Sequence, residues 1–281
     1  MSESQARNGS LLRASVLMAS GTMVSRVLGF IKTAMLLAAL GSAGGAVSAA
    51  FQTANTLPNT IFNLLASGVF DAVLVPQIVR ALKRDEGQVY INRLITLAGT
   101  ILFLVAFVST LLAPLLIIIM APGYSMEIRS LAVSFAFLCL PQIFFYGLYT
   151  VIGQVLNAKE AFGAFMWAPV LNNVVAIAAL FIFIFTFGAQ DTTINPPRHS
   201  VESWTSMQTI FLAGSATLGV ALQAIVLFIP LRKLGLRLKP DFGWRGIGLR
   251  EASRLAIWTL AAGAVSNLSY MYMTRVAASV V

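Results

Sequence analysis

Two cationic side chains, Arg26 and Lys32, lie inside the first long apolar run of the sequence, with no acidic residue nearby in the chain. Placing a charged side chain in the hydrocarbon core of a membrane costs roughly 2.5–3.5 kcal/mol on insertion scales. Such a group is kept where it faces a wet cavity or meets a counter-charge. An arginine fork can donate two parallel hydrogen bonds to a phosphate. We therefore interpret this pair as a binding site for an anionic, phosphate-containing substrate.

The spacing of residues 22–33 places the polar and small side chains on one helical face. At about 100° per residue, Lys32 falls within about 20° of Ser25, and Arg26 lies about 100° away from it. The large apolar side chains of this run occupy the remaining arc. We expect Ser25, Arg26 and Lys32 to face a cavity.

A second run carries a stripe of amide, hydroxyl and acidic residues whose positions step by three or four, so that they share one side of a helix. The stripe consists of Ser48, Gln52, Asn55, Thr56, Asn59, Asn63, Ser67 and Asp71. Asn59 is a candidate substrate ligand, and Asn55 and Asn63 are candidate cavity-lining residues. The alternative is that these side chains only hold helices together. Pro58 predicts a kink or a break in the helix.

The residue types needed for other chemistry are scarce. The sequence has one cysteine, Cys139, and one histidine, His199, so neither a disulfide framework nor a His/Cys metal site can be assembled. It also offers no catalytic triad, carboxylate pair or nucleotide-binding loop. We expect no catalytic residue, no metal and no cofactor, and we predict that the protein is not an enzyme.

The composition predicts an all-α polytopic membrane protein. Of 281 residues, 58% are hydrophobic and 10% are charged, and the mean hydropathy is +0.84, whereas soluble domains carry about 25% charged residues. Seven apolar runs are long enough to cross a bilayer. They are Leu12–Leu40, Val47–Val79, Leu94–Met120, Ile128–Leu156, Phe162–Phe187, Met207–Leu231 and Ser253–Val280.

The net charge of +9 is explained by its placement. Lysine and arginine concentrate before the first run and in the second, fourth and sixth linkers, whereas the other linkers contain only Arg129 and Arg198. Cytoplasmic loops carry such an excess. We therefore predict a multi-pass protein of the cell membrane with a cytoplasmic N-terminus, contacts with membrane lipids and no nucleic-acid partner.

Several motifs are similar to those of one known family, the lipid II flippases MurJ, also called MviN. Residues 25–30 (Ser-Arg-Val-Leu-Gly-Phe), 57–59 (Leu-Pro-Asn), 68–70 (Gly-Val-Phe) and 75–76 (Val-Pro) resemble its opening pattern. Residues 155–158 (Val-Leu-Asn-Ala) and 168–173 (Ala-Pro-Val-Leu-Asn-Asn) resemble its fourth and fifth spans. Residues 54–56 and 65–70 look like the actinobacterial branch.

This resemblance implies two helical lobes around a cationic cavity, and flipping of lipid II, the undecaprenyl-pyrophosphate-linked peptidoglycan precursor, to the outer face by alternating access. It implies that Ser25, Arg26, Lys32 and Asn59 contact the pyrophosphate and sugars. Lys32 stands where many members have arginine. Lysine keeps the positive charge at this position but lacks the planar guanidinium that donates two parallel hydrogen bonds. Lipid II, membrane lipids and cell-wall synthesis proteins are the expected partners.

The chain resembles the first lobe of this family plus one helix. Residues 1–11 would form a cytoplasmic tail, 12–231 the six-helix lobe, 232–252 a basic linker at the membrane interface and 253–281 the first helix of a second lobe. Two alternatives are a cation-coupled multidrug or polysaccharide-lipid exporter of the same superfamily, and a non-transporting scaffold for cell-wall synthesis. The sequence leaves open whether the chain is a fragment or a natural half.

Overall fold

The computed structural model describes residues 3–41, 45–66 and 87–243, and the regular elements among these residues are all helices. In chain order the helices are α1 (Glu3–Leu40), α2 (Ala46–Leu65), α4 (Gly87–Leu111), α5 (Ala113–Met120), α6 (Met126–Cys139), α7 (Gln142–Ala158), α8 (Phe162–Phe187), α9 (Ser206–Ile225) and α10 (Phe228–Lys233). The predicted all-α fold is confirmed.

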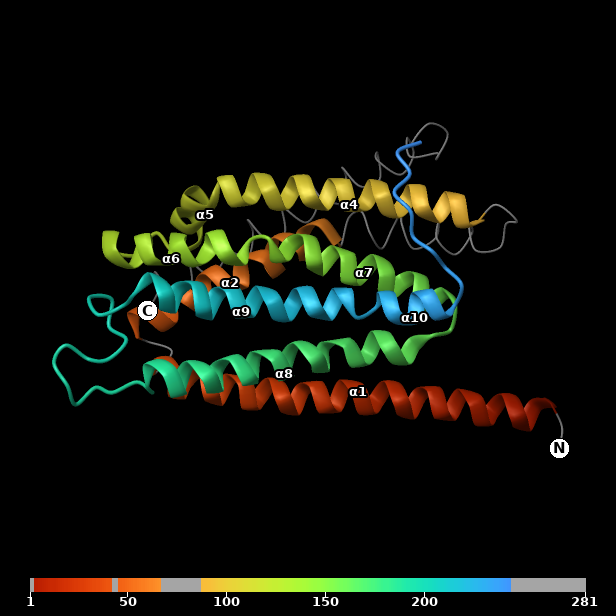
Figure 1. Cartoon of the computed structure of the whole chain (residues 1–281), viewed down its shortest axis with the longest axis horizontal. Coiled ribbons are helices and arrows are strands. Elements are labelled where there is room, and N and C mark those ends of the chain that lie inside the picture. The colour runs from red at the N-terminus through yellow and green to blue at the C-terminus, as the bar shows by residue number, and fades with distance from the viewer. Residues whose placement is uncertain (1–2, 42–44, 67–86, 244–281) are drawn as a thin grey trace, which may run out of the picture.

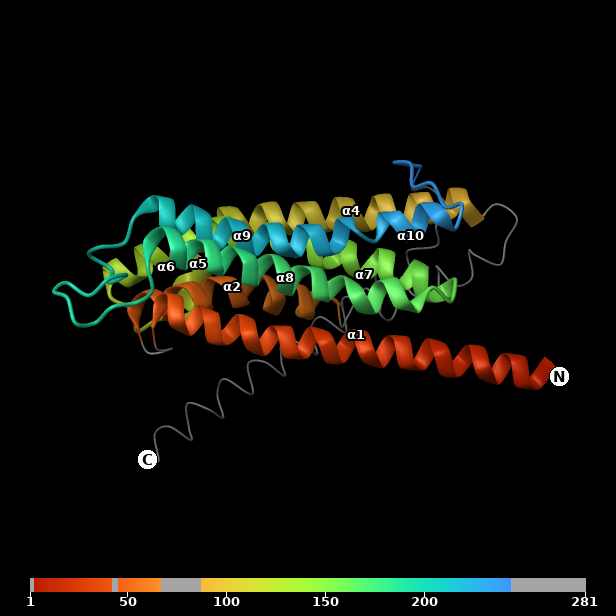
Figure 2. The ribbon, with the colours of Figure 1, turned by 60° about the horizontal axis from the view of Figure 1, so that its bottom comes forward.

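The helices form a bundle in which the chain runs back and forth along one long axis (Figure 1). Helices α1 and α8 both run away from the end where the N-terminus lies, and α2 and α9 return toward it. Helix α1 lies along one edge of the bundle, where it packs mainly against α8 (Figure 2). Helices α7 and α9 contact each other in the interior, where α2, α4, α8 and α10 also pack against α7, and α2, α6 and α8 against α9.

Three predicted spans are each divided into two helices, at positions near prolines. The break between α4 and α5 precedes Pro114, the break between α6 and α7 contains Pro141, and α10 contains Pro230. Proline lacks the backbone N–H of a regular helix and its ring crowds the preceding turn. The predicted spans are thus retained as candidate crossings, and the structure adds the breaks within them.

Pro58 behaves differently, because α2 continues through it from Ala46 to Leu65. The side chain of Pro58 is buried, and its neighbour Leu57 belongs to the apolar core. Packing on the buried side stabilises the helix despite the lost hydrogen bond. No break occurs at this predicted position.

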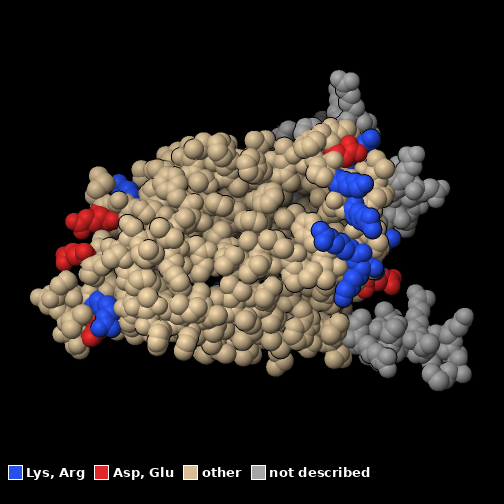
Figure 3. All heavy atoms as spheres, in the orientation of Figure 1, with Lys and Arg blue, Asp and Glu red and all other residues tan. Residues whose placement is uncertain are grey.

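Five helical segments of the described residues are long and apolar enough to span a membrane, among them α8 and the joined α6–α7 and α9–α10 pairs. On the face shown in Figure 3, the charged side chains lie at the two ends of the bundle and the middle is uncharged. Cations dominate the end that contains the start of α4 and all of α10. The cations of these elements are Arg93 of α4, Lys159 directly after α7, Arg232 and Lys233 of α10, and Arg237 and Lys239 in the segment that follows α10.

The remaining predicted boundaries are met in part. Helix α8 has the predicted bounds, and α1 ends at the predicted Leu40. The predicted tail 1–11 is helical from Glu3 onward. The end of the second predicted span beyond residue 66, including Asp71, and the whole of Ser253–Val280 lie outside the described residues.

Candidate substrate cavity

A cavity of about 90 Å³ lies inside the bundle, between α1, α2, α7, α8 and α9. Each of these helices contributes at least one polar side chain to its wall. The polar lining residues are Lys32, Asn55, Gln142, Tyr146, Asn172 and Ser215, and apolar groups such as Phe51, Leu180 and Leu212 complete it. The cavity therefore combines one cation with several uncharged donors and acceptors.

Lys32 supplies the charge of this cavity. Its side chain is half-buried and lines the wall. The ion pair found among the described residues joins Arg93 to Asp241, so Lys32 has no carboxylate partner within that part of the chain. An ammonium group in this position satisfies its charge by binding an anion or water.

A chain of hydrogen bonds fixes the polar groups next to Lys32. Gln142 is 1% exposed, and its side-chain amide donates to Asn55 Oδ1 at 3.2 Å and to Thr217 Oγ1 at 3.0 Å. The Tyr146 hydroxyl donates to Gln142 Oε1 at 3.4 Å. Gln142 thus connects α2, α7 and α9, and holds Asn55 and Tyr146 at the cavity wall.

Helix α8 presents Asn172 from the opposite side. Its side-chain amide donates to Gln223 Oε1 on α9 at 2.9 Å. A Cβ atom at Gly219 of α9 would lie 2.5 Å from Asn172 Oδ1, so the absence of a side chain at Gly219 allows the two helices to approach. This close approach brings Asn172 into the lining.

The structure separates the two predicted cations of α1. Ser25 is half-buried against α8, where Asn173 donates to its carbonyl oxygen at 2.8 Å and to its hydroxyl at 3.1 Å. Arg26 is exposed and is not part of the cavity lining. Its angle of about 100° from Ser25 on the helix accounts for this difference. The role of Arg26 in binding stays a prediction.

The predicted amide stripe of α2 is divided in the same way. Asn55 lines the cavity, whereas Asn59 and Asn63 are exposed and are joined by a hydrogen bond of 2.6 Å from Asn63 Nδ2 to Asn59 Oδ1. Neither of these two residues lines the cavity. Substrate binding by Asn59 and Asn63 therefore stays a prediction.

Sequence reasoning did not select Gln142, Tyr146 or Asn172 as site residues. Their signal was nevertheless present, because Gln142 and Asn172 are amides within apolar runs of the fourth and fifth predicted spans. Polar side chains in such runs face the bundle interior or a water-filled cavity.

Solved structures identify the class of fold. The chain is similar to a lipid II flippase MurJ in an inward closed conformation (TM-score 0.64, 18% identity, 89% of this chain and 48% of that one). It is also similar to a MOP superfamily transporter from Pyrococcus furiosus (TM-score 0.65, 15% identity, 94% and 55%) and to a MATE protein in complex with MaD3S (TM-score 0.66, 16% identity, 95% and 56%). The protein is a multi-pass helical membrane protein with the fold shared by these proteins.

Within that class, residues 37–281 match the family model described as Lipid II flippase MurJ, and the chain belongs to this family. Probable lipid II flippases from Synechocystis and from Rhizobium tropici are each 27% identical to it, over 94% and 92% of this chain. These matches cover 48% and 47% of the two relatives. The chain therefore spans about half the length of the curated relatives it matches.

Proposed function

We propose that this chain forms the first lobe of a lipid II flippase, which carries the lipid-linked peptidoglycan precursor across the cytoplasmic membrane by alternating access. Family membership supports this proposal, because the matched relatives carry the name lipid II flippase. In this proposal residues 12–231 are the lobe, 232–252 the linker and 253–281 the start of a second lobe. The protein acts as a transporter and not as an enzyme.

The observation that carries the proposal is the position of Lys32, a half-buried cation on a polar cavity wall with no described carboxylate partner. Lipid II offers a pyrophosphate, whose charge and acceptor oxygens match an ammonium group. The side-chain amides of Asn55 and Asn172 offer hydrogen bonds to sugar or peptide groups, whereas the amide hydrogens of Gln142 are already used to hold Asn55 and Thr217. Ser25, Arg26 and Asn59, which do not line this cavity, would make the remaining contacts with the pyrophosphate and the sugars.

The size of the cavity restricts what it holds in this conformation. Pockets for drug-sized ligands measure roughly 300–1,000 Å³, whereas this cavity measures about 90 Å³. It therefore accepts a compact anionic group and not an entire glycopeptide headgroup. Opening of the bundle would be needed to admit the rest of the substrate.

The distribution of charge supports the proposed orientation. The end of the bundle with the start of α4 and α10 is rich in lysine and arginine (Figure 3), and cytoplasmic loops carry this excess. We place the N-terminus in the cytoplasm on this ground. Cell-wall synthesis proteins would be partners of the assembled flippase.

Cation-coupled export of drugs or of polysaccharide lipids is the alternative suggested by the shared fold. Proton or sodium coupling uses carboxylates within the membrane. In the described spans the one acidic residue is Glu127, in the first turn of α6. The observed residues therefore favour an anionic substrate over cation coupling, and a binding assay distinguishes transport from a purely structural role.

The test measures binding of fluorescent lipid II to the purified chain in lipid nanodiscs. Lys32→Met removes the charge at similar length, and we expect binding to weaken on the order of tenfold or more, as for loss of a charged hydrogen bond. Lys32→Arg should bind like the wild type. Lys159→Met removes a cation at the end of α7 and is the matched control.

Unchanged lipid II binding by Lys32→Met would overturn the cavity assignment. Binding of a lipophilic cation in place of lipid II would favour the drug exporter. Binding of neither ligand would favour the alternative that the protein is a non-transporting scaffold for cell-wall synthesis.

A further inference from the structure

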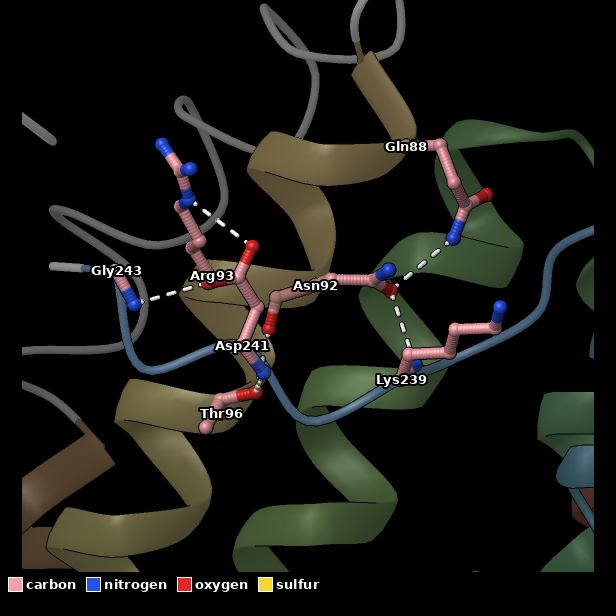
Figure 4. A network of polar contacts seen from close by, with 7 residues as sticks. All are labelled: Gln88, Asn92, Arg93, Thr96, Lys239, Asp241 and Gly243. Atoms are coloured by element: carbon pink, nitrogen blue, oxygen red, sulfur yellow. Dashed lines mark hydrogen bonds and ion pairs between the residues drawn. The ribbon is translucent and has the colours of Figure 1, made fainter.

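A second candidate site lies far from the cavity, where residues 234–243 leave α10 and cross to α4. Main-chain groups of this segment are bound by polar side chains of α4 (Figure 4). Gln88 donates to the carbonyl of Arg237 at 2.9 Å, Asn92 accepts from the N–H of Lys239 at 3.3 Å, and Thr96 accepts from the N–H of Asp241 at 2.9 Å. The path of the segment is therefore fixed by its backbone.

The one acidic side chain of this segment is already paired. Arg93 Nε donates to Asp241 Oδ2 at 3.1 Å, and Asp241 Oδ1 accepts from the N–H of Gly243 at 2.9 Å. In Figure 4 the side chain of Lys239 extends away from Asp241. The cations of the segment are thus not neutralised by its own carboxylate.

Two adjoining hollows result from this arrangement. One has a volume of about 540 Å³ and is lined by three cations, Arg232, Arg237 and Lys239, together with leucine side chains. Among the described residues none of the three forms an ion pair. The hollow lies at the cation-rich end of the bundle (Figure 3), at the level expected for lipid headgroups.

The second hollow has a volume of about 470 Å³ and is mainly apolar. Aromatic side chains from three helices and from the segment 234–243 line it, namely Phe103, Phe144, Phe228 and Phe242. It shares Phe228, Leu238 and Lys239 with the cationic hollow. The cationic hollow is thus continuous with an apolar groove, and this groove runs along α4 toward the middle of the membrane.

We propose that these two hollows together bind one anionic glycerophospholipid, with its phosphate among Arg232, Arg237 and Lys239 and an acyl chain in the groove along α4. Charge complementarity selects the anionic headgroup. Only an acyl chain fills the apolar groove, so a free phosphate would occupy the cationic hollow and leave the groove empty. A lipid bound here would fill the space between α4, α10 and the segment that joins them.

Gly99 offers a steric test of the groove. It lines the apolar hollow, and a Cβ atom added to it would meet nothing within 4 Å. The Cβ atom of Gly99→Leu therefore meets no clash, and its side chain starts from the wall of the groove proposed for the acyl chain. Gly214 of α9 has the same open surroundings and does not line this groove, so Gly214→Leu is its matched control.

The experiment reconstitutes the chain in mixed micelles with equal amounts of phosphatidylglycerol and phosphatidylcholine of identical acyl chains, and counts retained lipids by native mass spectrometry. We expect one phosphatidylglycerol to be retained in preference to phosphatidylcholine. Removing each cation, by Arg232→Gln, Arg237→Gln or Lys239→Gln, should reduce that preference by about fivefold. The control Lys233→Gln, outside the lining, should keep it.

Gly99→Leu should abolish retention of the lipid, while Gly214→Leu should retain it. Glycerol phosphate, which carries the headgroup charge but has no acyl chain, should fail to displace the lipid. Equal retention of the two lipids by the wild type, or unchanged preference after all three cations are removed, would overturn the proposal. Lys32→Met should leave phosphatidylglycerol retention intact, which separates this site from the lipid II cavity.

Discussion

The side-chain amide of Asn173 donates two hydrogen bonds to one residue of the neighbouring helix, to the carbonyl oxygen of Ser25 at 2.8 Å and to its hydroxyl at 3.1 Å. This pair fastens α1 to α8 at the start of the 25–33 motif. It also fixes α1 at a point about two turns before Lys32. Ser25 was predicted as a substrate ligand, and in this structure its oxygen atoms serve the contact between helices.

Asn173→Ala should weaken the docking of α1, because both hydrogen bonds are lost within an apolar bundle. Interhelical hydrogen bonds in membrane proteins contribute about 0.6 kcal/mol on average and up to about 1.7 kcal/mol, so we expect a loss of about 1–2 kcal/mol. Ser25→Ala should cost less, because the bond to its carbonyl remains. Unfolding in increasing sodium dodecyl sulfate measures both effects.

Thr22→Ala provides the control for this pair, since the Thr22 hydroxyl donates to the Met18 carbonyl of its own helix. It should change stability by less than Ser25→Ala. Equal effects of Asn173→Ala and Thr22→Ala would show that the Asn173 contact does not hold α1 in place.

Arg26→Ala should abolish export of the cell-wall precursor while the protein still inserts in the membrane, because the exposed guanidinium is proposed to meet the pyrophosphate. The measurement is growth of cells depleted of their own flippase and supplied with the variant, with membrane levels checked by immunoblotting. Arg129→Ala, at the other end of the bundle, should support growth. If cells with Arg26→Ala grow as well as wild type, Arg26 has no part in binding.

Gly153→Ala should destabilise the contact between α7 and α8. A Cβ atom at Gly153 would overlap the ring of Phe165, which stacks on Tyr149 with ring centroids 4.7 Å apart. Overpacking of this kind costs about 1–3 kcal/mol. Gly214→Ala, which has open space, should be neutral or stabilise by up to about 1 kcal/mol. Thermal unfolding followed by size-exclusion chromatography compares the two, and similar melting temperatures would contradict the prediction.

The loop between α8 and α9 contains a histidine held in one neutral form. His199 is 3% exposed. Gln208 Oε1 accepts from the Thr205 N–H, so its Nε2 group faces His199 Nδ1 at 3.0 Å and donates to it. The proton of the ring is therefore on Nε2, which donates to the Gly188 carbonyl at 2.9 Å. A second proton, on Nδ1, would point at the Gln208 Nε2 group, which is also a donor, and this hydrogen bond would be lost.

Burial lowers the pKa of His199 below its usual value, and the nearby charge of Arg198 adds to this, while the bond to Gly188 opposes it. The folded loop thus prefers the neutral ring. Its contribution to stability is fully present above the unfolded pKa of about 6.5 and is lost as the pH falls through the lower folded value. Since the chain has one histidine, a single imidazole resonance in an NMR titration reports the midpoint.

We expect that midpoint to lie below about 6.5. His199→Gln should remove the pH dependence of loop stability between pH 5 and 7. A midpoint above about 6.5 would mean that the charged ring is the one stabilised in the folded loop.

The sequence was sufficient to place most membrane-spanning runs, because length and apolarity alone decide whether a segment crosses a bilayer. Helix α8 has the predicted bounds, Phe162–Phe187, and Gly188 follows it with φ 83° and ψ 163°, a backbone conformation that glycine adopts readily and other residues do not. The breaks near Pro114 and Pro141 were missed because apolarity continues through them.

The site was predictable only in part, because a helical wheel shows which residues share a face but not which part of that face meets a neighbour. Ser25 and Lys32 lie on nearly the same line of α1, and the structure directs both inward, to α8 and to the cavity. Arg26 belongs to the same broad face and is exposed. Gln142 and Asn172 reach the cavity through tertiary packing, which has no signature in local spacing.

The turn between α6 and α7 has a mechanical consequence. The carbonyl of Leu138, just before Pro141, accepts a hydrogen bond from Thr217 of α9 at 2.7 Å, and Thr217 in turn accepts one from Gln142 at the start of α7. The hydroxyl of Thr217 is therefore hydrogen-bonded to both α6 and α7, the two helices of one membrane crossing. If α9 slides along its axis, it must either break these bonds or move α6 and α7 with it. Movement of α9 is thus coupled to the cavity wall where Gln142 lies.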